Sequence, residues 1–313
     1  MIPARSVITS FSLCLPRFFT IIAGGDSMNK QRLFMNLARL AFFALATNYS
    51  SLLIAGFVDP DLNNWARSNL SSPSISGEQK RLVVILKAPE YKNRSGLTQP
   101  MAIWGEKTHA KMALQSSIQD IRRLSLRPTD SPFIWASNAV VISADRRGLA
   151  ALKRRGDVEA ILESKVIQFE KPIEKMGKNK TDESKMTYGL QLIQAESAWG
   201  YGTRGAGVSV GIIDTGIDET HPELVGKVLL AKDFTGDGNA MDYFGHGTHV
   251  AGTIAGGNAA GRHIGVAPEA KLVIAKVFDR KGGATLEGIL KGMEWMLDPD
   301  GDPETADAPR VVS

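Results

Sequence analysis

The spacing of apolar residues between residues 80 and 170 predicts a small domain of four strands and two helices. The expected elements, in chain order, are a strand at 82–86, a helix at 101–124, strands at 133–136 and 139–142, a helix at 145–155 and a strand at 158–162. Apolar residues recur at helical spacing in the first helix, whereas the strands are short runs bounded by turn residues. This βαββαβ order is typical of a ferredoxin-like α+β domain.

From Tyr188 onward, apolar strands alternate with helices. Strands are expected at 208–213, 271–277 and 310–312, and helices at 246–256 and 286–297. The first of these strands is apolar at almost every position, as in a parallel strand that is covered on both faces. Alternation of this kind predicts an α/β fold with a parallel sheet and flanking helices.

Two segments with few apolar residues separate these parts. Residues 58–79 are rich in Ser, Asn and Pro and are expected to form a linker. Residues 171–187 are charged and have almost nothing to bury, so they are predicted to be a second, exposed linker. Because proteolysis concentrates in exposed segments, we expect a processing site there. The resulting division is a leader at 1–57, a domain at 80–170 and a domain at 188–313.

The leader has the pattern of a targeting segment. Lys30, Arg32 and Arg39 precede a short apolar run that ends in Ala44-Leu45-Ala46. Basic residues, a short apolar stretch and an A-x-A-like end are the features of a secretory signal peptide. Polar residues at 47–51 interrupt the apolar stretch, which argues against a membrane anchor. We therefore expect a secreted, extracellular protein, with a leader of no defined structure as the alternative.

Composition narrows the possible classes. The 313 residues are 43% hydrophobic and 22% charged, which is ordinary for a globular protein and sufficient for two domains. Lys and Arg number 37 against 33 Asp and Glu, and the small net charge of +4 is spread along the chain, so no nucleic-acid partner is indicated. Cys14 is the only cysteine, which excludes a disulfide scaffold and cysteine-based zinc sites.

Two motifs suggest other chemistries but lack the required context. Residues 200–205 match G-x-G-x-x-G, yet they precede a predicted strand, whereas a dinucleotide-binding loop follows a strand and opens a helix. His246 and His249 form H-x-x-H without the glutamate of the zinc-hydrolase motif and without an evident third ligand. Nucleotide binding and metal-dependent hydrolysis are therefore minor alternatives.

Asp214 and His246 form the most informative pair. Asp214 follows a buried strand, where α/β sheets place active sites, and His246 begins a helix between Gly245 and Gly247. An aspartate that accepts a hydrogen bond from one imidazole nitrogen fixes the tautomer, and the other nitrogen can then accept a proton from a nucleophile. The structural alternative is an aspartate that caps a helix and a histidine that is satisfied in the core.

Four segments around this pair resemble the subtilisin-like serine peptidases, the subtilase or S8 family. They are Asp214-Thr-Gly-Ile-Asp218, His221-Pro-Glu-Leu224, His246-Gly-Thr-His-Val-Ala-Gly-Thr253 and Gly265-Val-Ala-Pro268. The resemblance runs from about Tyr188 to the C-terminus and implies a subtilisin-like parallel sheet with flanking helices. It implies that Asp214 is the acid and His246 the general base of an Asp-His-Ser triad, and that His249 is not catalytic. Residues 80–170 resemble the family's propeptide, an intramolecular chaperone and inhibitor.

The sequence lacks the family's third signature. No Gly-Thr-Ser-Met-Ala occurs in the 313 residues, and Ser313 does not stand in the context of the nucleophile. The resemblance therefore implies a serine endopeptidase precursor that is represented only to the middle of its catalytic domain and is inactive alone. Polypeptides are the expected substrates, and the propeptide is the expected internal partner. The alternatives are a non-catalytic inhibitor or chaperone built on the propeptide and a non-functional gene fragment.

Candidate substrate-binding residues follow from the same resemblance. Gly282, Gly283 and Ala284 match the segment that binds extended substrates by strand addition. Phe278 matches a position near an apolar subsite of the family. These four residues and the pair of Asp214 and His246 are the predicted site.

No cofactor is expected. A structural calcium ion is the one exception considered, but Glu223 replaces the usual aspartate ligand and residues 258–261 lack the typical ligand loop. Asp237 and Asp242 could bind a cation or a basic substrate residue, or could belong to a solvated loop.

Overall fold

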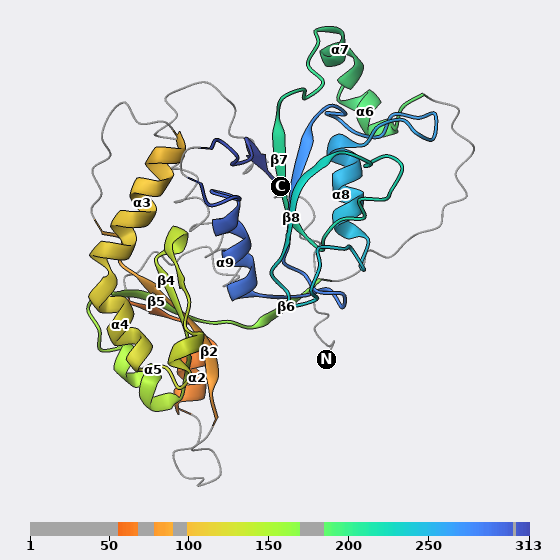
Figure 1. The fold of residues 1–313 in the computed structure, drawn as a ribbon. Coiled ribbons are helices and arrows are strands. Elements are labelled where there is room, and N and C mark those ends of the chain that lie inside the picture. The colour runs from red at the N-terminus through yellow and green to blue at the C-terminus, as the bar shows by residue number, and fades with distance from the viewer. Residues whose placement is uncertain (1–55, 68–77, 90–98, 170–184, 303–304) are drawn as a thin grey trace, which may run out of the picture.

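The computed structural model describes residues 56–67, 78–89, 99–169, 185–302 and 305–313, which form two lobes (Figure 1). The predicted signal peptide and most of the predicted processing linker lie outside these residues. None of the helices in the described ranges combines the length and the apolar character needed to cross a membrane.

A five-stranded sheet forms the N-terminal lobe. Its strands lie in the order β1 (Phe57–Val58), β5 (Val158–Glu163), β2 (Lys80–Leu86), β4 (Ala139–Ala144) and β3 (Phe133–Ile134). Neighbouring strands are antiparallel, except for the parallel pair of β1 and β5. The predicted βαββαβ order is present in β2 to β5 and their helices, with β1 added at one edge.

Helices pack against this sheet. They are α2 (Pro60–Arg67), α3 (Gln99–Ala113), α4 (Gln115–Arg123) and α5 (Arg146–Leu152), and two 3-10 turns lie at Pro128–Asp130 and Trp135–Ser137. Side chains of α2, α4 and α5, among them Leu62, Ile121 and Leu149, share one core with β2 and β4. The Asp145 carboxylate accepts a hydrogen bond from the Gly148 N–H at 2.8 Å, as expected for the cap of α5.

The segment predicted as a linker at 58–79 begins as ordered structure. Strand β1 pairs with β5, and α2 follows at once. Leu62 is completely buried and Trp65 is 8% exposed, because these residues lie one turn apart and face the same core. The other residues of α2 are mostly polar, so the helix could not be recognised from the sequence. The linker assignment is therefore wrong for residues 58–67.

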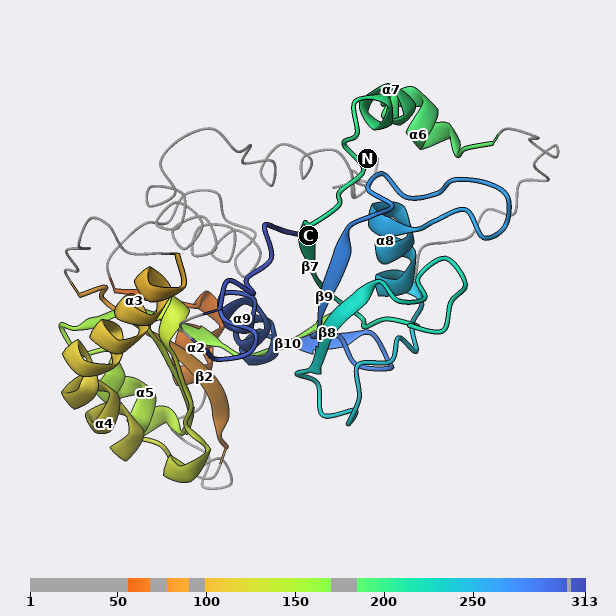
Figure 2. The ribbon, with the colours of Figure 1, turned by 45° about the horizontal axis from the view of Figure 1, so that its top comes forward.

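A four-stranded parallel sheet forms the C-terminal lobe. Its order is β11 (Val311–Val312), β7 (Ser209–Asp214), β9 (Lys271–Lys276) and β8 (Val228–Asp233). Helix α8 (His246–Ala255) packs on one face and α9 (Leu286–Trp295) on the other (Figure 2). The predicted parallel sheet with flanking helices is confirmed. Strand β8 was not predicted from the sequence. It is an edge strand with Leu229 and Leu230 exposed, so no buried apolar face identifies it as a strand.

Two short helices, α6 (Tyr188–Leu192) and α7 (Ala195–Gly200), precede the sheet. The Trp199 indole N–H donates a hydrogen bond to the Val266 carbonyl oxygen at 2.9 Å, which ties α7 to the loop before β9. The glycine-rich motif at 200–205 forms the turn between α7 and β7, and no helix follows it there. This motif therefore lacks the geometry of a dinucleotide-binding loop.

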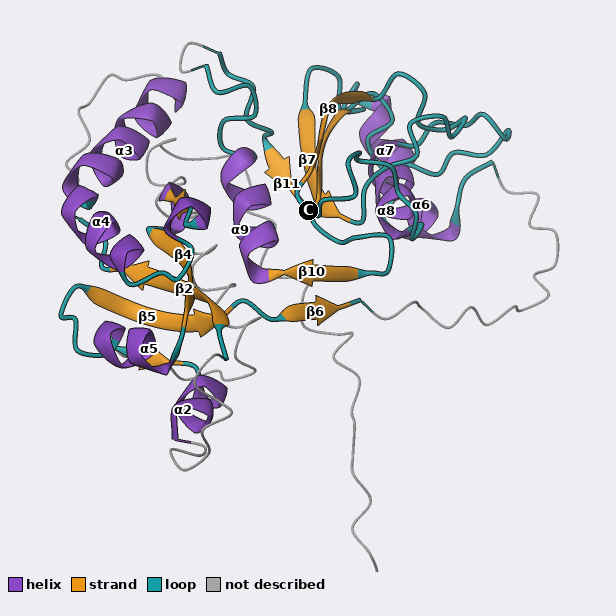
Figure 3. Cartoon of the chain, turned by 60° about the horizontal axis from the view of Figure 1, so that its bottom comes forward, coloured by secondary structure: helices purple, strands orange, loops and turns teal. Residues whose placement is uncertain are grey.

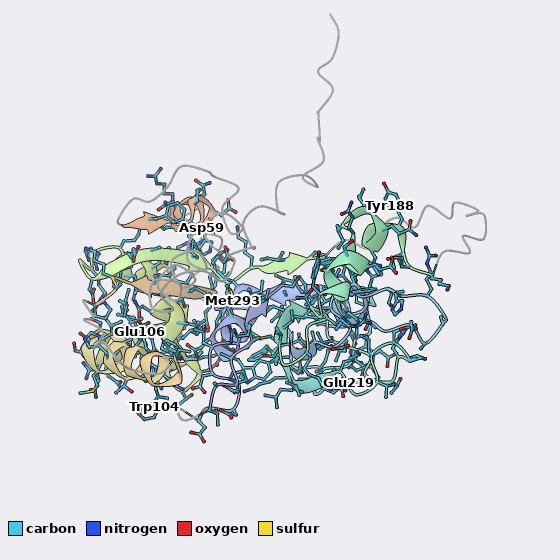
Figure 4. All side chains as sticks on the ribbon, turned by 90° about the horizontal axis from the view of Figure 1, so that it is seen from above. Asp59, Trp104, Glu106, Tyr188, Glu219 and Met293 are labelled. Carbon is cyan, nitrogen blue, oxygen red and sulfur yellow. The ribbon has the colours of Figure 1, made fainter. Side chains whose placement is uncertain are left out.

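Helix α9 joins the two lobes. Leu286 and Leu290 lie in one apolar cluster with residues of β2, β4 and β5. Trp295, at the end of the same helix, packs in the core formed with β9. Figure 4 shows Met293 of this helix where the two lobes meet. Side chains on different faces of α9 thus complete two different cores.

Ion pairs flank the apolar contact between the lobes. Arg81 Nε lies 3.0 Å from Glu287 Oε2, and Lys107 Nζ lies 3.1 Å from Asp298 Oδ2. Burial would raise the pKa of Glu287, but hydrogen bonds from Arg81 and Lys291 outweigh it and hold this pKa below its ordinary value. Glu287 therefore stays ionised in the contact. Its ion pair with Arg81 fixes the orientation of the N-terminal lobe on α9.

Replacing Leu290 with alanine should destabilise the chain. Leu290 is 5% exposed between α9 and the N-terminal sheet, so a shorter side chain leaves a cavity there. A buried leucine-to-alanine change costs about 2–5 kcal/mol, which denaturant unfolding should measure. Leu229→Ala, at a 55% exposed position of β8, is the control and should change stability by less than about 0.5 kcal/mol. Equal effects of the two changes would contradict this interface.

Glu294 of α9 also contacts the N-terminal lobe. Its Oε2 accepts a hydrogen bond from the backbone N–H of Ala136 at 3.1 Å, in a 3-10 turn of that lobe. Burial raises the pKa of Glu294 to about 7, although the backbone N–H groups of Ala136 and Trp135 and the charges of Lys107 and Lys111 act in the opposite direction. The folded chain therefore binds this proton more tightly than the unfolded chain does.

The free energy of unfolding should fall as the pH rises through the raised pKa of Glu294, which is about 7 against an ordinary 4.5. A pKa that is higher in the folded state contributes stability below the ordinary value, and this stability is lost above the raised value. The loss amounts to about 3 kcal/mol at most. Glu294→Gln can still accept the hydrogen bond from Ala136 but cannot titrate. The free energy of unfolding of the variant should therefore increase relative to that of the wild type as the pH rises toward neutral. If the difference in unfolding free energy between the variant and the wild type did not change with pH, this expectation would be contradicted.

Candidate active site

Asp214 is the last residue of β7, at the carboxyl edge of the parallel sheet. Its Cα lies opposite that of Lys276, the last residue of the neighbouring strand β9. Its side chain is only 12% exposed, and Oδ1 accepts the backbone N–H of Thr215 at 2.6 Å. The sheet thus presents this carboxylate at the edge where α/β folds build active sites.

His246 is the first residue of α8, and Asp242 organises the turn before it. Asp242 Oδ1 accepts bonds from the Gly245 N–H at 2.7 Å and the Thr215 hydroxyl at 2.9 Å, and Oδ2 accepts the Thr248 N–H at 2.8 Å. Burial would raise the pKa of Asp242, but these hydrogen bonds outweigh it and lower the pKa. Asp242 is therefore an ionised helix cap with both oxygens occupied, rather than a free ligand for a cation or a basic substrate residue.

The two elements bring Asp214 and His246 into direct contact. Nδ1 of His246 lies 2.8 Å from each carboxylate oxygen of Asp214. When Nδ1 carries the proton and donates it to the carboxylate, Nε2 is left as a proton acceptor. The imidazole is 29% exposed, so part of the ring remains accessible. In the part of the chain that the structure describes, no serine hydroxyl bonds to this histidine.

A close backbone contact fixes the pair. The Gly247 N–H donates to Thr215 Oγ1 at 2.8 Å, directly between the turn after β7 and the start of α8. A Cβ atom at Gly247 would lie 2.2 Å from the Gly216 carbonyl oxygen, so no side chain fits at this position. The glycine is needed for the approach of α8 to β7.

Gly247→Ala should therefore separate the helix from the strand. Relief of the clash requires a backbone shift, and overpacking of this kind costs about 1–3 kcal/mol or more. Gly189→Ala in α6 is the matched control, because a Cβ there meets nothing within 4 Å. Thermal unfolding should show a large loss for Gly247→Ala only, together with loss of the hydrogen-bonded Nδ1 proton signal of His246. An intact signal in Gly247→Ala would show that the contact tolerates a methyl group.

Lys276 is completely buried at the end of β9. Its Nζ donates to the Thr215 carbonyl oxygen at 2.7 Å and lies 3.4 Å from Asp237 Oδ2. Asp237 also accepts the backbone N–H of Arg280 at 2.9 Å, so this carboxylate too is committed to partners within the chain. Lys276 was not identified from the sequence; the available signal is a lysine that ends the apolar run 272–275 within the strand.

The predicted peptide-binding strand already carries an extended segment of the chain. Strand β10 (Gly283–Thr285) pairs antiparallel with β6 (Val166–Gln168), which leaves the N-terminal lobe (Figure 3). The Phe169 N–H extends this ladder with a hydrogen bond to the Gly282 carbonyl oxygen at 2.7 Å. Gly282 has a φ of +79°, and a Cβ there would lie 2.6 Å from the Phe244 ring. Gly282, Gly283 and Ala284 thus form one edge of the site next to the Asp-His pair.

Phe169 lies in an aromatic pocket beside His246. Its ring centroid is 4.4 Å from that of His246, 5.3 Å from that of Phe278 and 5.6 Å from that of Phe244. Phe278 is the residue predicted near an apolar subsite. Phe244 was not identified from the sequence, although its place two residues before His246 is a signal that could have found it.

The structure gives the metal-pair alternative no support. His249 lies on the first turn of α8 and is exposed. Among the described residues, the group of three carboxylate or imidazole ligands close enough to hold a metal consists of Asp298, Asp300 and Asp307, which includes neither histidine.

Glu223, the residue considered as a calcium ligand, has one carboxylate oxygen bonded within the chain. Its Oε1 accepts the Ala260 N–H at 3.0 Å, while Oε2 is buried without a hydrogen-bond partner. Calcium takes about six to eight oxygen ligands, and the facing loop offers Ala259 and Ala260 where side-chain oxygens would be needed.

Comparison with known proteins agrees with this geometry. Residues 205–313 match the Subtilase family. An intracellular serine protease of Paenibacillus polymyxa is 41% identical over 115 residues, covering 35% of this chain and 35% of that protein. The major intracellular serine protease of Bacillus subtilis (strain 168) is 38% identical over 123 residues, covering 37% and 39%. Subtilisin DY of Bacillus licheniformis is 43% identical over 109 residues, covering 34% and 39%.

The chain spans 35–39% of the length of these relatives. The matched segment contains Asp214, His246 and β10, and its parallel sheet has helices on both faces. Sequence match, fold and the arrangement of the Asp-His pair all point in the same direction. Over residues 205–313, the chain is similar in sequence to the subtilisin-like S8 family of serine peptidases.

Proposed function

We propose that this chain forms the Asp-His part of a subtilisin-type serine endopeptidase precursor. The observation that carries the proposal is the contact between His246 and Asp214 directly beside β10, a strand edge that holds an extended peptide segment. Polypeptide substrates follow from this arrangement, because strand addition uses backbone groups that every peptide has. The names of the matched relatives, which are serine proteases, support the same reaction class.

In the proposed reaction, His246 moves the proton and Asp214 holds the histidine. A serine hydroxyl attacks the peptide carbonyl carbon while Nε2 accepts the hydroxyl proton, and the same nitrogen then donates it to the departing amine. Water repeats the two steps on the acyl-enzyme and releases the second product. Asp214 accepts from Nδ1 throughout and stabilises the imidazolium. The nucleophilic serine would have to come from a segment outside residues 1–313.

In this proposal, the N-terminal lobe is a propeptide that blocks the site. It docks on α9 through the apolar cluster that contains Leu286 and Leu290, and β6 leads from it onto β10. Phe169 then bonds to Gly282 and packs against His246, so a substrate would need the same strand and the same space. Cleavage in the linker at 171–187, which follows directly, would cut the covalent connection between inhibitor and catalyst.

A serine-supplemented chain tests the proposal. In this polypeptide, residues 1–313 continue into a segment with the Gly-Thr-Ser-Met-Ala signature, taken from the native reading frame or from a matched relative. It should hydrolyse peptides, react with a serine-directed fluorophosphonate and cut itself within or next to 171–187. The polypeptide of residues 1–313 is the control and should do none of the three. Specific labelling of that control, or complete inhibition of the supplemented chain by a zinc chelator, would refute the mechanism.

Export is a separate part of the proposal. The pattern around Ala44-Leu45-Ala46 supports a cleaved signal peptide, whereas two of the matched relatives are named intracellular. Expression with residues 1–57 should release a chain whose new N-terminus lies near Thr47. Retention of an uncleaved chain inside the cell would refute export and leave the proposed chemistry unaffected.

A further inference from the structure

The pocket around Phe169 differs from the rest of the contact between β6 and β10. The side chains of β6 are largely in solvent: Val166 is 65% exposed and Ile167 is 38% exposed. Phe169, by contrast, lies among the rings of Phe244, His246 and Phe278. The strand ladder uses backbone groups that all peptides share, so it does not discriminate between side chains. Discrimination between the side chains of bound segments therefore depends on this pocket.

The rings meet edge to face. The planes of Phe169 and Phe244 are inclined at 82°, and those of Phe169 and Phe278 at 79°. In this arrangement the positive edge of one ring lies against the negative face of another, which an aliphatic side chain cannot reproduce. The third wall is the imidazole of His246, whose plane is tilted by 53° to that of Phe169.

Two walls of the pocket are held by the surrounding structure. The Phe244 N–H donates to Asp242 Oδ1 at 3.0 Å in the capped turn before α8, and its ring packs directly on the backbone of Gly282. Phe278 packs on the core between β9 and α9. A pocket that is already formed loses little conformational freedom when a ring enters it, and this favours selective binding.

We propose that this site selects polypeptides with an aromatic side chain at the position that contacts His246, and that Phe244 and Phe278 determine this specificity. The inference rests on the proposed function in one respect only, namely that a substrate lies along β10 as β6 does. Recognition of the ring itself needs no serine and can be measured in the chain of 313 residues.

Hydrogen exchange in that chain tests the recognition without catalysis. Exchange of the backbone amides in residues 166–169 reports how firmly β6 is seated on β10. Phe169→Ala should increase the exchange rate by about ten- to hundredfold, because two edge-to-face contacts and the buried area of the ring are lost together. Phe169→Tyr and Phe169→Trp should stay within about threefold of the wild type. Val166→Ala, at the exposed end of the same strand, is the matched control and should change little.

The effects of substitutions in the pocket walls on exchange should depend on whether Phe169 is present. Phe244→Leu and Phe278→Leu keep apolar volume but remove the rings, so each should loosen residues 166–169. In the chain with both leucines, Phe169→Ala should have much less effect than in the wild type. Unchanged exchange in β4 shows that the N-terminal lobe stays folded in every variant. Wild-type exchange in Phe169→Leu, or fully additive effects, would overturn aromatic selection.

The serine-supplemented chain gives an independent readout. Peptides with an aromatic residue at this position should have a kcat/KM at least about tenfold above peptides with alanine or leucine there, and Phe244→Leu should reduce that ratio. Hydrolysis without this preference would overturn the inference and leave the proposed function standing. Absence of all hydrolysis would count against the proposed function, whereas the exchange measurements would still decide the inference.

Discussion

Replacing His246 with alanine in the serine-supplemented chain is expected to lower kcat by about 10⁶, the loss found when the base of a related subtilisin triad is removed alone. The contact of Nδ1 with Asp214 at 2.8 Å fixes both the place and the tautomer of the ring, and alanine offers no proton acceptor in its place. A residual acceleration of about 10³–10⁴ over water should persist, because binding and oxyanion stabilisation do not need the base. Hydrolysis of a chromogenic peptide and self-cleavage in 171–187 measure the effect.

His249→Ala is the control for this experiment. The side chain lies on the same helix, three residues on, but it is exposed, whereas the bonds to the Asp214 carboxylate come from His246. The resemblance suggests a structural histidine at this position, and its exposure here predicts a small effect on activity and stability. Normal self-processing in His246→Ala would contradict the triad. Equal losses in both variants would indicate damage to α8 rather than to the chemistry.

Asp214→Asn is expected to lower kcat by about 10⁴ while leaving the fold intact, as in the related triad in which the same exchange was made. An amide has the shape of the carboxylate, so the side chain can remain in its 12% exposed place next to Thr215. However, the amide N–H₂ can donate to Nδ1, and this favours the imidazole tautomer whose Nε2 carries the proton and cannot accept another. The decisive measurement is kcat together with unfolding by denaturant.

Glu219→Gln provides the matched control for this change. It makes the same acid-to-amide exchange at an exposed position of the C-terminal lobe, labelled in Figure 4. Its kcat should equal that of the unmodified supplemented chain. A decrease of less than about tenfold in Asp214→Asn would contradict the tautomer argument, because a group that only fills space tolerates an isosteric amide.

Within the described residues, the N-terminal lobe contacts the C-terminal lobe at two separate places. One is the apolar and charged contact with α9, which includes Leu290 and Glu294; the other is the ladder between β6 and β10, which ends at Phe169. Cleavage of the linker at 171–187 breaks neither contact. Release of the site after such a cut therefore requires that both contacts dissociate, and the pH dependence expected for Glu294 acts on the first of them.

Much of this architecture follows from local patterns in the sequence. The βαββαβ order and the central strands of both sheets could be predicted because their side chains are buried on one or both faces and leave a clear apolar pattern. The buried strand before Asp214 and the glycines on both sides of His246 marked these two residues as candidates, and the resemblance to the family's signature segments supplied their predicted roles. Gly282, Gly283, Ala284 and Phe278 could be placed on one segment by resemblance alone.

Other features depend on contacts between segments that are far apart in the chain. Helix α2 has only two large apolar residues, Leu62 and Trp65, and β8 exposes most of its side chains, so each is defined by the sheet it joins rather than by its own pattern. The aromatic pocket brings together Phe169, Phe244 and Phe278, and the buried Lys276 meets the backbone of Thr215 across two neighbouring strands. The sequence by itself therefore determined the strands and helices with a clear apolar pattern and the candidate residues for the chemistry. Only the tertiary structure decided that β6 pairs with β10 and that Phe169 and Phe244 pack beside His246, because strand pairing and ring packing depend on distances in space that no local spacing encodes.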